Sequence, residues 1–208
     1  MNKLLLILTL CFLTFHATAQ GDWISLFDGK SLDGWKISEN PASFLIEEGV
    51  LKVDGKRAHL FYDGPIGNHD FKNFEFKAEV KTEPGANSGI FIHTQFQEEG
   101  WPSVGYEIQV NQTHSDWRKT GSLYSVNDVK EVFVKDNEWY TQHIIVKGDK
   151  ITVKINDKVV MEYDESEDKE RDPTKIGTQK LSSGTIALQA HDPKSIIYYK
   201  NIQVKLLP

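Results

Sequence analysis

Three segments of the chain, residues 89–95, 104–111 and 184–191, alternate apolar residues with polar ones. This period of two predicts strands with one face in a hydrophobic core and the other face outside it. The outer positions do not carry the Lys and Glu of an ordinary solvent face but groups that donate and accept hydrogen bonds: His93, Glu107, Gln109, Asn111, Gln189 and His191. A sheet that presents these groups together suits a sugar, whose hydroxyls need fixed partners. Taken singly, each residue is better explained by simple exposure, and only the repetition on three strands favours a site.

Three of these residues also form a donor set for a divalent cation, since two imidazoles and one carboxylate bind zinc-type ions. His93, Glu107 and His191 share the non-core parity of their strands, so we expect them to converge on one face. No local spacing such as H-E-x-x-H supports a metal, and no other cofactor is indicated. Glu107 and His191 are at the same time candidates for acid–base catalysis.

A second concentration of reactive side chains follows residues 104–111. Residues 113–122 read THSDWRKTGS, in which His114 and Lys119 are candidate acids or bases. The loop leaves the end of a predicted strand, so we expect it to hang over the polar face, although loops are polar by default. Aromatic candidates for contact with a sugar ring complete the predicted site: Trp101, Trp117 and Tyr124.

The elements that position these residues are strands throughout. Residues 74–81 alternate apolar with charged side chains, and residues 144–163 form two successive hairpins, the second turning at Asn156-Asp157. No segment shows a helical apolar stripe longer than two turns. Regularly spaced strands without helices predict an all-β sandwich or barrel, with residues 20–208 as a single domain.

Charge and cysteine content exclude several partners and chemistries. Lys and Arg total 24 against 30 Asp and Glu, a net charge of −6, which argues against nucleic acid and against an anionic membrane surface. The single cysteine, Cys11, lies in the apolar N-terminal segment. The remaining chain therefore offers no disulfide, thiolate nucleophile or cysteine metal ligand.

Residues 1–19 are typical of a secretory signal peptide. Lys3 precedes an apolar run over residues 4–15, and Ala17-Thr18-Ala19 matches the small-x-small cleavage pattern. The run is too short for a bilayer span, which needs about 20 apolar residues. Leu10 before Cys11 disfavours a lipoprotein site. We expect cleavage after Ala19 and export to the periplasm or the exterior, with no membrane association afterwards.

Five segments, in order along the chain, are similar to one family of exported bacterial proteins. They are WISLFDGKSLDGW at 23–35, NSGIFIH at 87–93, GYEIQVN at 105–111, TGSLYS at 120–125 and GTIALQAHDPKSIIYYKNIQVKLL at 184–207. Together they resemble the 3-keto-disaccharide hydrolase domain family. His93 stands where that family often has Arg, and Asn156-Asp157 where it often has Asn-Gly.

The resemblance implies a concanavalin A-like jelly roll of two antiparallel sheets and action on glycosides already oxidised at C3. The ketone acidifies the C2 hydrogen, so that a base removes it and the C1 oxygen leaves; water then adds, or does not. Glu107-x-Gln109-x-Asn111 lacks the E-x-D-x-x-E carboxylates of jelly-roll glucanases, which disfavours ordinary retaining hydrolysis. The sequence thus predicts an exported enzyme on 3-keto-glycosides, hydrolase or lyase, with a sugar as its partner. The alternative is a non-catalytic, lectin-like sugar-binding module, and no oligomeric state is indicated.

Overall fold

The computed structural model describes residues 22–175 and 177–208. The predicted signal peptide, residues 1–19, lies outside these residues. Across the described residues, thirteen strands form two antiparallel sheets, one of eight strands and one of five. Helical structure there is limited to two short 3-10 turns, η1 (Pro41–Ser43) and η2 (Ile66–His69), and no helix is long and apolar enough to cross a bilayer. The predicted all-β sandwich is therefore confirmed.

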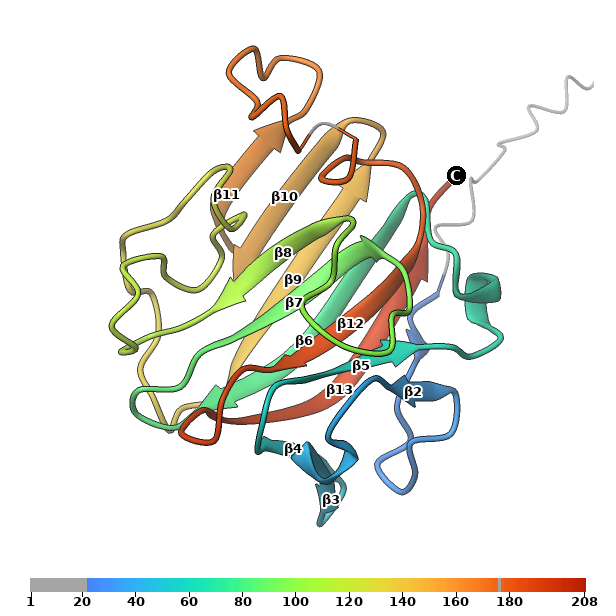
Figure 1. Cartoon of the computed structure of the whole chain (residues 1–208), viewed down its shortest axis with the longest axis vertical. Coiled ribbons are helices and arrows are strands. Elements are labelled where there is room, and N and C mark those ends of the chain that lie inside the picture. Colours follow the sequence, from blue (N-terminus) through green and yellow to red (C-terminus); the bar gives the residue numbers. More distant parts are fainter. Residues whose placement is uncertain (1–21, 176) are drawn as a thin grey trace, which may run out of the picture.

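The larger sheet forms the rear layer in Figure 1. Its strands lie in the order β11 (Lys158–Asp164), β10 (Lys150–Ile155), β9 (Tyr140–Lys147), β6 (Phe74–Thr82), β13 (Ile196–Leu206), β4 (Val50–Asp54) and β3 (Phe44–Glu47), and β1 (Ile24–Ser25) pairs with β13. The predicted turn Asn156-Asp157 joins β10 to β11. Both turn residues have positive φ, 47° and 66°, as a two-residue type I′ turn requires.

The smaller sheet forms the front layer in Figure 1. Its strands lie in the order β2 (Trp35–Ile37), β5 (Ala58–Tyr62), β12 (Thr185–Ala190), β7 (Ser88–Thr94) and β8 (Tyr106–Val110). This sheet therefore brings together the three segments that the sequence marks as polar on one side, β7, β8 and β12. β5 is not predicted from the sequence, because its residues AHLFY do not alternate between apolar and polar.

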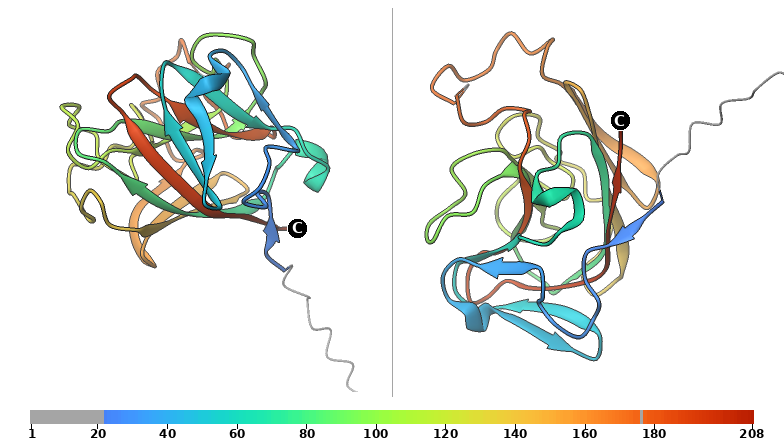
Figure 2. Two further views of the ribbon diagram at one scale, coloured as in Figure 1. Left: turned by 90° about the horizontal axis from the view of Figure 1, so that it is seen from below. Right: turned by 90° about the vertical axis from the view of Figure 1, so that its right-hand side faces the viewer.

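The hydrophobic core lies between the two sheets, whose facing layers Figure 2 shows from two further directions. In β6, buried and half-buried residues alternate along the whole strand, so that only one of its faces reaches the core. Strands β5, β7 and β12 are instead buried at every position. Their outer face is covered by loops, and the loop 95–105 passes in front of β12 and β5 in Figure 1. The smaller sheet thus has a sheltered outer face, which is where the polar residues gather.

Candidate functional site

Two rows of side chains run across the outer face of the smaller sheet, perpendicular to its strands. The strand register places Phe61, Ala187, Phe91 and Glu107 in the first row. The second row contains His59, Gln189, Gly89 and Gln109. The first row is apolar except for its carboxyl, and the second is polar except for its glycine. This arrangement places one ionisable acid beside a line of hydrogen-bonding groups.

A cavity of about 380 Å³ opens above the β7–β8 end of these rows. Its lining consists of Asn87, Phe91, Trp101, Pro102, Glu107, Gln109, Tyr124, Gln189 and His191. Six of the residues predicted from the sequence line it: Trp101, Glu107, Gln109, Tyr124, Gln189 and His191. The mixture of aromatic and polar walls is typical of small-molecule sites.

Glu107 provides the carboxyl of this cavity. Burial raises the pKa of Glu107 to about 8, while the hydrogen bond from Gln189 opposes this shift and the charge of Asp116 adds to it. Gln189 Nε2 donates to Glu107 Oε1 over 3.1 Å. The backbone N–H of Tyr124 donates to the Glu107 carbonyl, which keeps the Tyr124 residue beside the strand. A carboxyl with this pKa can give or take a proton near neutral pH.

Two amide side chains on the cavity floor have unused acceptors. Gln109 Nε2 donates to Asn87 Oδ1 over 2.7 Å. The carbonyl oxygens Oε1 of Gln109 and Gln189 are buried and have no hydrogen-bond partner among the described residues. An unpaired buried polar atom costs about 1–3 kcal/mol, so these positions favour a ligand that brings hydroxyl donors.

His191 lies at the rim of the cavity and is paired with the carboxylate of the next residue, Asp192. Its Nδ1 lies 2.7 Å from Asp192 Oδ2. Burial works against the ionised form of Asp192, but hydrogen bonds from His191, the Lys194 N–H and Ser195 lower its pKa below the ordinary range. The ring of His191 packs against Trp101, with centroids 5.2 Å apart. A histidine fixed in this way at Nδ1 presents its other nitrogen for proton transfer.

The loop after β8 reaches the rim of the site, and Asn111 organises it. Asn111 Nδ2 donates to the carbonyls of Asp116 and Arg118 over 2.9 and 2.7 Å, and its Oδ1 accepts from the His114 N–H. Lys119 Nζ donates to the His114 and Asp116 carbonyls. This bonding brings the His114 ring to 6.0 Å from that of His191.

Comparison with known proteins identifies the family of this chain. The model of the 3-keto-alpha-glucoside-1,2-lyase-like domain matches residues 22–205. The chain belongs to this family. The resemblance seen in the five sequence segments is thereby confirmed, and family membership places the chain among carbohydrate-active proteins.

Relatives agree with this membership and define the fold. A 3-keto-disaccharide hydrolase from Bacteroides thetaiotaomicron is 27% identical over 89% of this chain and 78% of its own. A candidate glycosyl hydrolase of known structure from Parabacteroides distasonis has a TM-score of 0.76 at 22% identity, covering 91% of this chain and 95% of the other. A non-specific endo-β-1,3(4)-glucanase of family GH16 has a TM-score of 0.59 at 11% identity, covering 89% and 91%. These two structures show the fold alone, and they confirm the predicted jelly roll.

The prediction that His93 converges with Glu107 and His191 is wrong. His93 is buried, donates from Nε2 to the Lys72 carbonyl, accepts at Nδ1 from the Ser182 N–H, and lies with its ring 5.8 Å from that of the core residue Phe74. The cause is a β-bulge: two residues of β7, Ile92 and His93, face one of β12, Ile186, and His93 takes a φ of 51°. Such a bulge redirects a side chain that strand parity would place on the other face.

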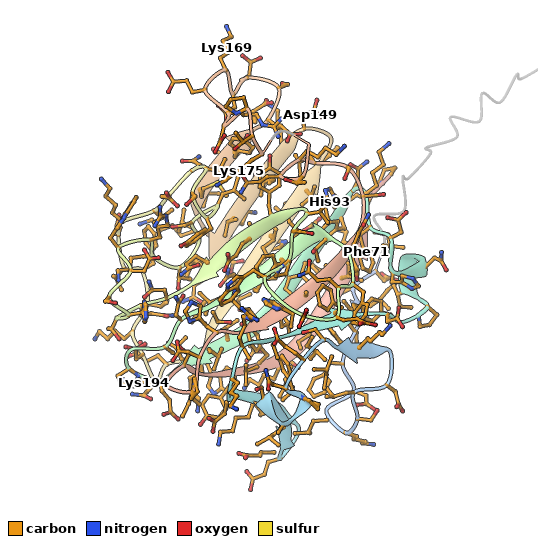
Figure 3. All side chains as sticks on the ribbon, in the orientation of Figure 1. Phe71, His93, Asp149, Lys169, Lys175 and Lys194 are labelled. Atoms are coloured by element: carbon orange, nitrogen blue, oxygen red, sulfur yellow. The ribbon has the colours of Figure 1, made fainter. Side chains whose placement is uncertain are left out.

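Position along the strand separates His93 from His191 as well. β7 and β12 are antiparallel, with Thr94 beside Thr185 at the start of β12, whereas His191 follows the end of β12. In Figure 3 the labelled His93 and Lys194, three residues beyond His191, lie at opposite ends of the sheet. The predicted metal set is therefore not assembled. Among residues 22–175 and 177–208, no three His, Cys, Asp or Glu side chains are grouped to hold a metal ion.

Four further predicted residues do not line the cavity. The His114 ring lies outside it, 6.0 Å from that of His191. Asn111 and Lys119 bond to the backbone of the loop, as described above, and hold its conformation. Trp117 is 48% exposed, with the guanidinium of Arg118 4.8 Å and the Lys130 ammonium 5.3 Å from its ring.

Several residues of the site were missed by sequence reasoning. Asn87 opens the NSGIFIH segment, directly before β7, and Asp192 follows His191 directly, so neither was far from a residue that the sequence marked. Phe91 has the outward parity of β7 but was passed over because it is apolar. His59 lies on β5, a strand that carries no readable alternation, and only the pairing of β5 with β12 brings it to the site.

Proposed function

We propose that this protein cleaves 3-keto-glycosides by removing the C2 proton and eliminating the substituent at C1. Membership of the lyase-like family and the 27% identity to a protein named 3-keto-disaccharide hydrolase support this substrate class. The observation that carries the proposal is that the cavity lining contains a single carboxyl, Glu107, with a pKa raised to about 8.

A single carboxyl is poorly suited to ordinary glycoside hydrolysis. Conventional retaining and inverting enzymes place two carboxyl groups on either side of the glycosidic bond, one as acid and one as nucleophile or base. Among the described residues that line the cavity, Glu107 has no such partner. One base does suffice where the substrate already carries an acidic C–H bond, as a 3-ketone does at C2.

The proposed steps balance without an oxidant. Ionised Glu107 takes the C2 proton, and the C2–H electron pair forms a C2=C3 enolate whose negative charge is on O3. The enolate then re-forms the ketone as the C1=C2 double bond forms and the C1–O bond breaks. The leaving oxygen keeps that electron pair and receives a proton. Addition of water across C1=C2 completes a net hydrolysis; omission of this step makes the reaction a lyase reaction.

Other residues take roles that fit their positions. His191, held by Asp192, supplies the proton to the leaving oxygen. The Tyr124 hydroxyl, whose pKa burial and the nearby Asp116 raise, stays protonated and donates a hydrogen bond to the enolate oxygen. The unpaired Oε1 atoms of Gln109 and Gln189 accept from sugar hydroxyls, and Trp101 packs against the sugar ring.

Export of the protein is part of this proposal. The Lys3 start, the apolar run 4–15 and the Ala17-Thr18-Ala19 pattern support a periplasmic or extracellular location. N-terminal sequencing of protein recovered outside the cytoplasm is expected to begin at Gln20. A mature protein that retains residues 1–19 would contradict cleavage at this position.

The substrate test compares matched sugars. Purified protein is expected to convert a 3-keto-glucoside and to leave the same, unoxidised glucoside intact. Deuterium at C2 is expected to slow conversion of the ketone, because the C2–H bond breaks in the first step. Equal turnover of both sugars would indicate a conventional glycosidase, and saturable binding of either sugar without turnover would indicate the lectin-like module.

A further inference from the structure

His59 is a buried histidine whose polar ring is not required by the packing around it. Its side chain is fully buried, and neither ring nitrogen has a hydrogen-bond partner among the described residues. The ring lies among aromatic side chains, with centroids 5.4 Å from Phe91 and 5.7 Å from Trp101. Buried polar groups are nearly always paired, and an apolar residue would fill this space without the unpaired nitrogens. The exception therefore calls for a ligand or a movement.

The position of His59 extends the polar row beyond the cavity. His59 pairs with Gln189 across β5 and β12, and the row continues through Gly89 to Gln109 on β8. Four neighbouring strands span three gaps, a distance of about 14 Å. This row is longer than one sugar ring, and Glu107 lies beside its β8 end while His59 lies at its β5 end.

The side chain of Trp101 covers the His59 end of the polar row. Trp101 is 45% exposed and belongs to the loop 95–105, which crosses β12 and β5 in Figure 1. Gln97 holds this loop from within, since its Nε2 donates to the Glu99 and Trp101 carbonyls and its Oε1 accepts from the Ser103 N–H. A loop bonded to itself in this way can shift as a unit while it keeps its shape.

The loop is anchored at its two ends, by the Phe96 ring 5.4 Å from that of Phe61 and by the Gly105 N–H, which donates to the Thr178 carbonyl, while its tip makes few contacts. At its tip, Gly100 N–H donates to Glu39 Oε1 over 3.0 Å, and the Arg57 guanidinium lies 5.3 Å from the Trp101 ring. The Trp101 ring otherwise rests on the rings of His59 and His191. A sugar that enters along the row meets this ring first, and displacing it exposes the nitrogens of His59.

We propose that His59 is a specificity-determining residue that binds the second sugar unit of a disaccharide substrate after Trp101 moves from its ring. This inference rests on the proposed function. The ring at Glu107 loses its C2 proton and its C1 substituent, and that substituent lies along the row towards β5. A neutral imidazole donates from one nitrogen and accepts at the other, so that beside the free Oε1 of Gln189 it matches neighbouring sugar hydroxyls. Burial keeps His59 neutral by lowering its pKa to about 4, against the opposing charge of Glu39; Arg57 and His191 add to the lowering.

The test is a comparison of two substrates in one variant. His59→Phe is expected to lower kcat/KM about 10- to 100-fold on a 3-keto-glucosyl-glucose and less than twofold on methyl 3-keto-glucoside, which has no second ring. The melting temperature is expected to stay level or rise, because two unpaired nitrogens are removed. An equal effect on both substrates, or none on the disaccharide, would overturn the inference and leave the proposed function intact.

A second histidine provides the matched control. His143, on β9 of the larger sheet, is partnered by Glu75 at 2.8 Å. His143→Phe is expected to lower the melting temperature and to leave both kcat/KM values unchanged. If the wild-type protein converts neither ketone, the proposed function fails and the inference falls with it.

The covering of His59 by Trp101 can be tested without measuring enzyme activity. Ring-nitrogen NMR of His59 in Trp101→Ala is expected to show a pKa closer to the ordinary value of 6.5 than in the wild type, since water then reaches the ring. Identical titration of His59 in both proteins would show that Trp101 is not its cover, and would overturn this part of the inference.

Discussion

The Glu107 side chain lies across the backbone of Gly89 on the neighbouring strand. A Cβ atom at position 89 would stand 2.7 Å from Glu107 Cγ and 2.8 Å from its Cδ, closer than side chains tolerate. Glycine inside a strand usually weakens the strand, and it is retained where another group must approach the backbone closely. Here that group is the one carboxyl of the cavity lining, held by Gln189 on the other side.

Gly89→Ala is expected to displace the Glu107 carboxyl and to lower turnover of a 3-keto-glucoside at least about 100-fold, the contribution typical of a positioned acid or base. Steady-state kinetics beside a melting curve measure this effect. Gly177→Ala is the matched control, because a Cβ there meets nothing within 4 Å. Wild-type kinetics in Gly89→Ala would contradict the assignment of Glu107 as the base.

Glu107→Gln is expected to lower turnover about 10²–10⁴-fold. In the wild type, the rate is expected to rise with pH towards about 8, as Glu107 loses the proton that disables it as a base. A pH–rate profile measured with the 3-keto-glucoside tests this rise of the rate with pH. A rate that is flat between pH 6 and 9 would place the base elsewhere.

The same carboxyl couples stability to pH. The folded protein holds the Glu107 proton up to about pH 8, whereas an unfolded carboxyl releases it near 4.5. The folded state therefore binds more protons between these values, and this group's contribution to stability decreases as the pH rises through that window. Urea unfolding is expected to show that Glu107→Gln gains stability relative to the wild type between pH 5 and pH 8. A constant difference would mean that the folded pKa is ordinary.

His93→Ala is expected to affect stability and to leave catalysis nearly unchanged. It removes the partners of the Lys72 carbonyl and the Ser182 N–H, which costs about 1–3 kcal/mol of unfolding free energy. Burial lowers the pKa of His93 below 6.5, so that the unfolded wild type binds a proton more readily than the folded one as the pH falls. Lowering the pH is therefore expected to reduce the difference in unfolding free energy between wild type and variant. Chemical denaturation at two pH values, beside kcat/KM on the 3-keto-glucoside, measures both effects. A large loss of activity in a variant that stays folded would show that His93 takes part in catalysis, and would contradict this prediction.

Asn111→Ala is expected to loosen the loop 112–119. Its side chain makes three hydrogen bonds to that loop, to Asp116, Arg118 and His114. Hydrogen exchange of the loop amides is expected to accelerate, while exchange in the larger sheet stays unchanged. Unaltered protection of the loop would show that Lys119 alone suffices to hold it.

Much of the fold was readable from local pattern. β6 alternates over nine residues, and Asn156-Asp157 tolerates the positive φ of a tight turn, so the strand and the hairpin were predicted where they lie. The polar parity of β8 and β12 likewise placed Glu107, Gln109 and Gln189 on one face. β5 was missed, since a strand buried on both faces loses the alternation by which strands are recognised.

The sequence by itself determined the class of fold, the family and most of the polar groups at the site, because strand period and turn chemistry are properties of neighbouring residues. Only the tertiary structure decided which of these groups meet. Parity assigns a side chain to a face of a strand, but the position along the sheet depends on register between segments distant in the chain. A bulge in β7 turned His93 into the interior, and the pairing of β5 with β12 set His59 beside Gln189. Register and bulges are settled by how the two sheets pack, which no local pattern records.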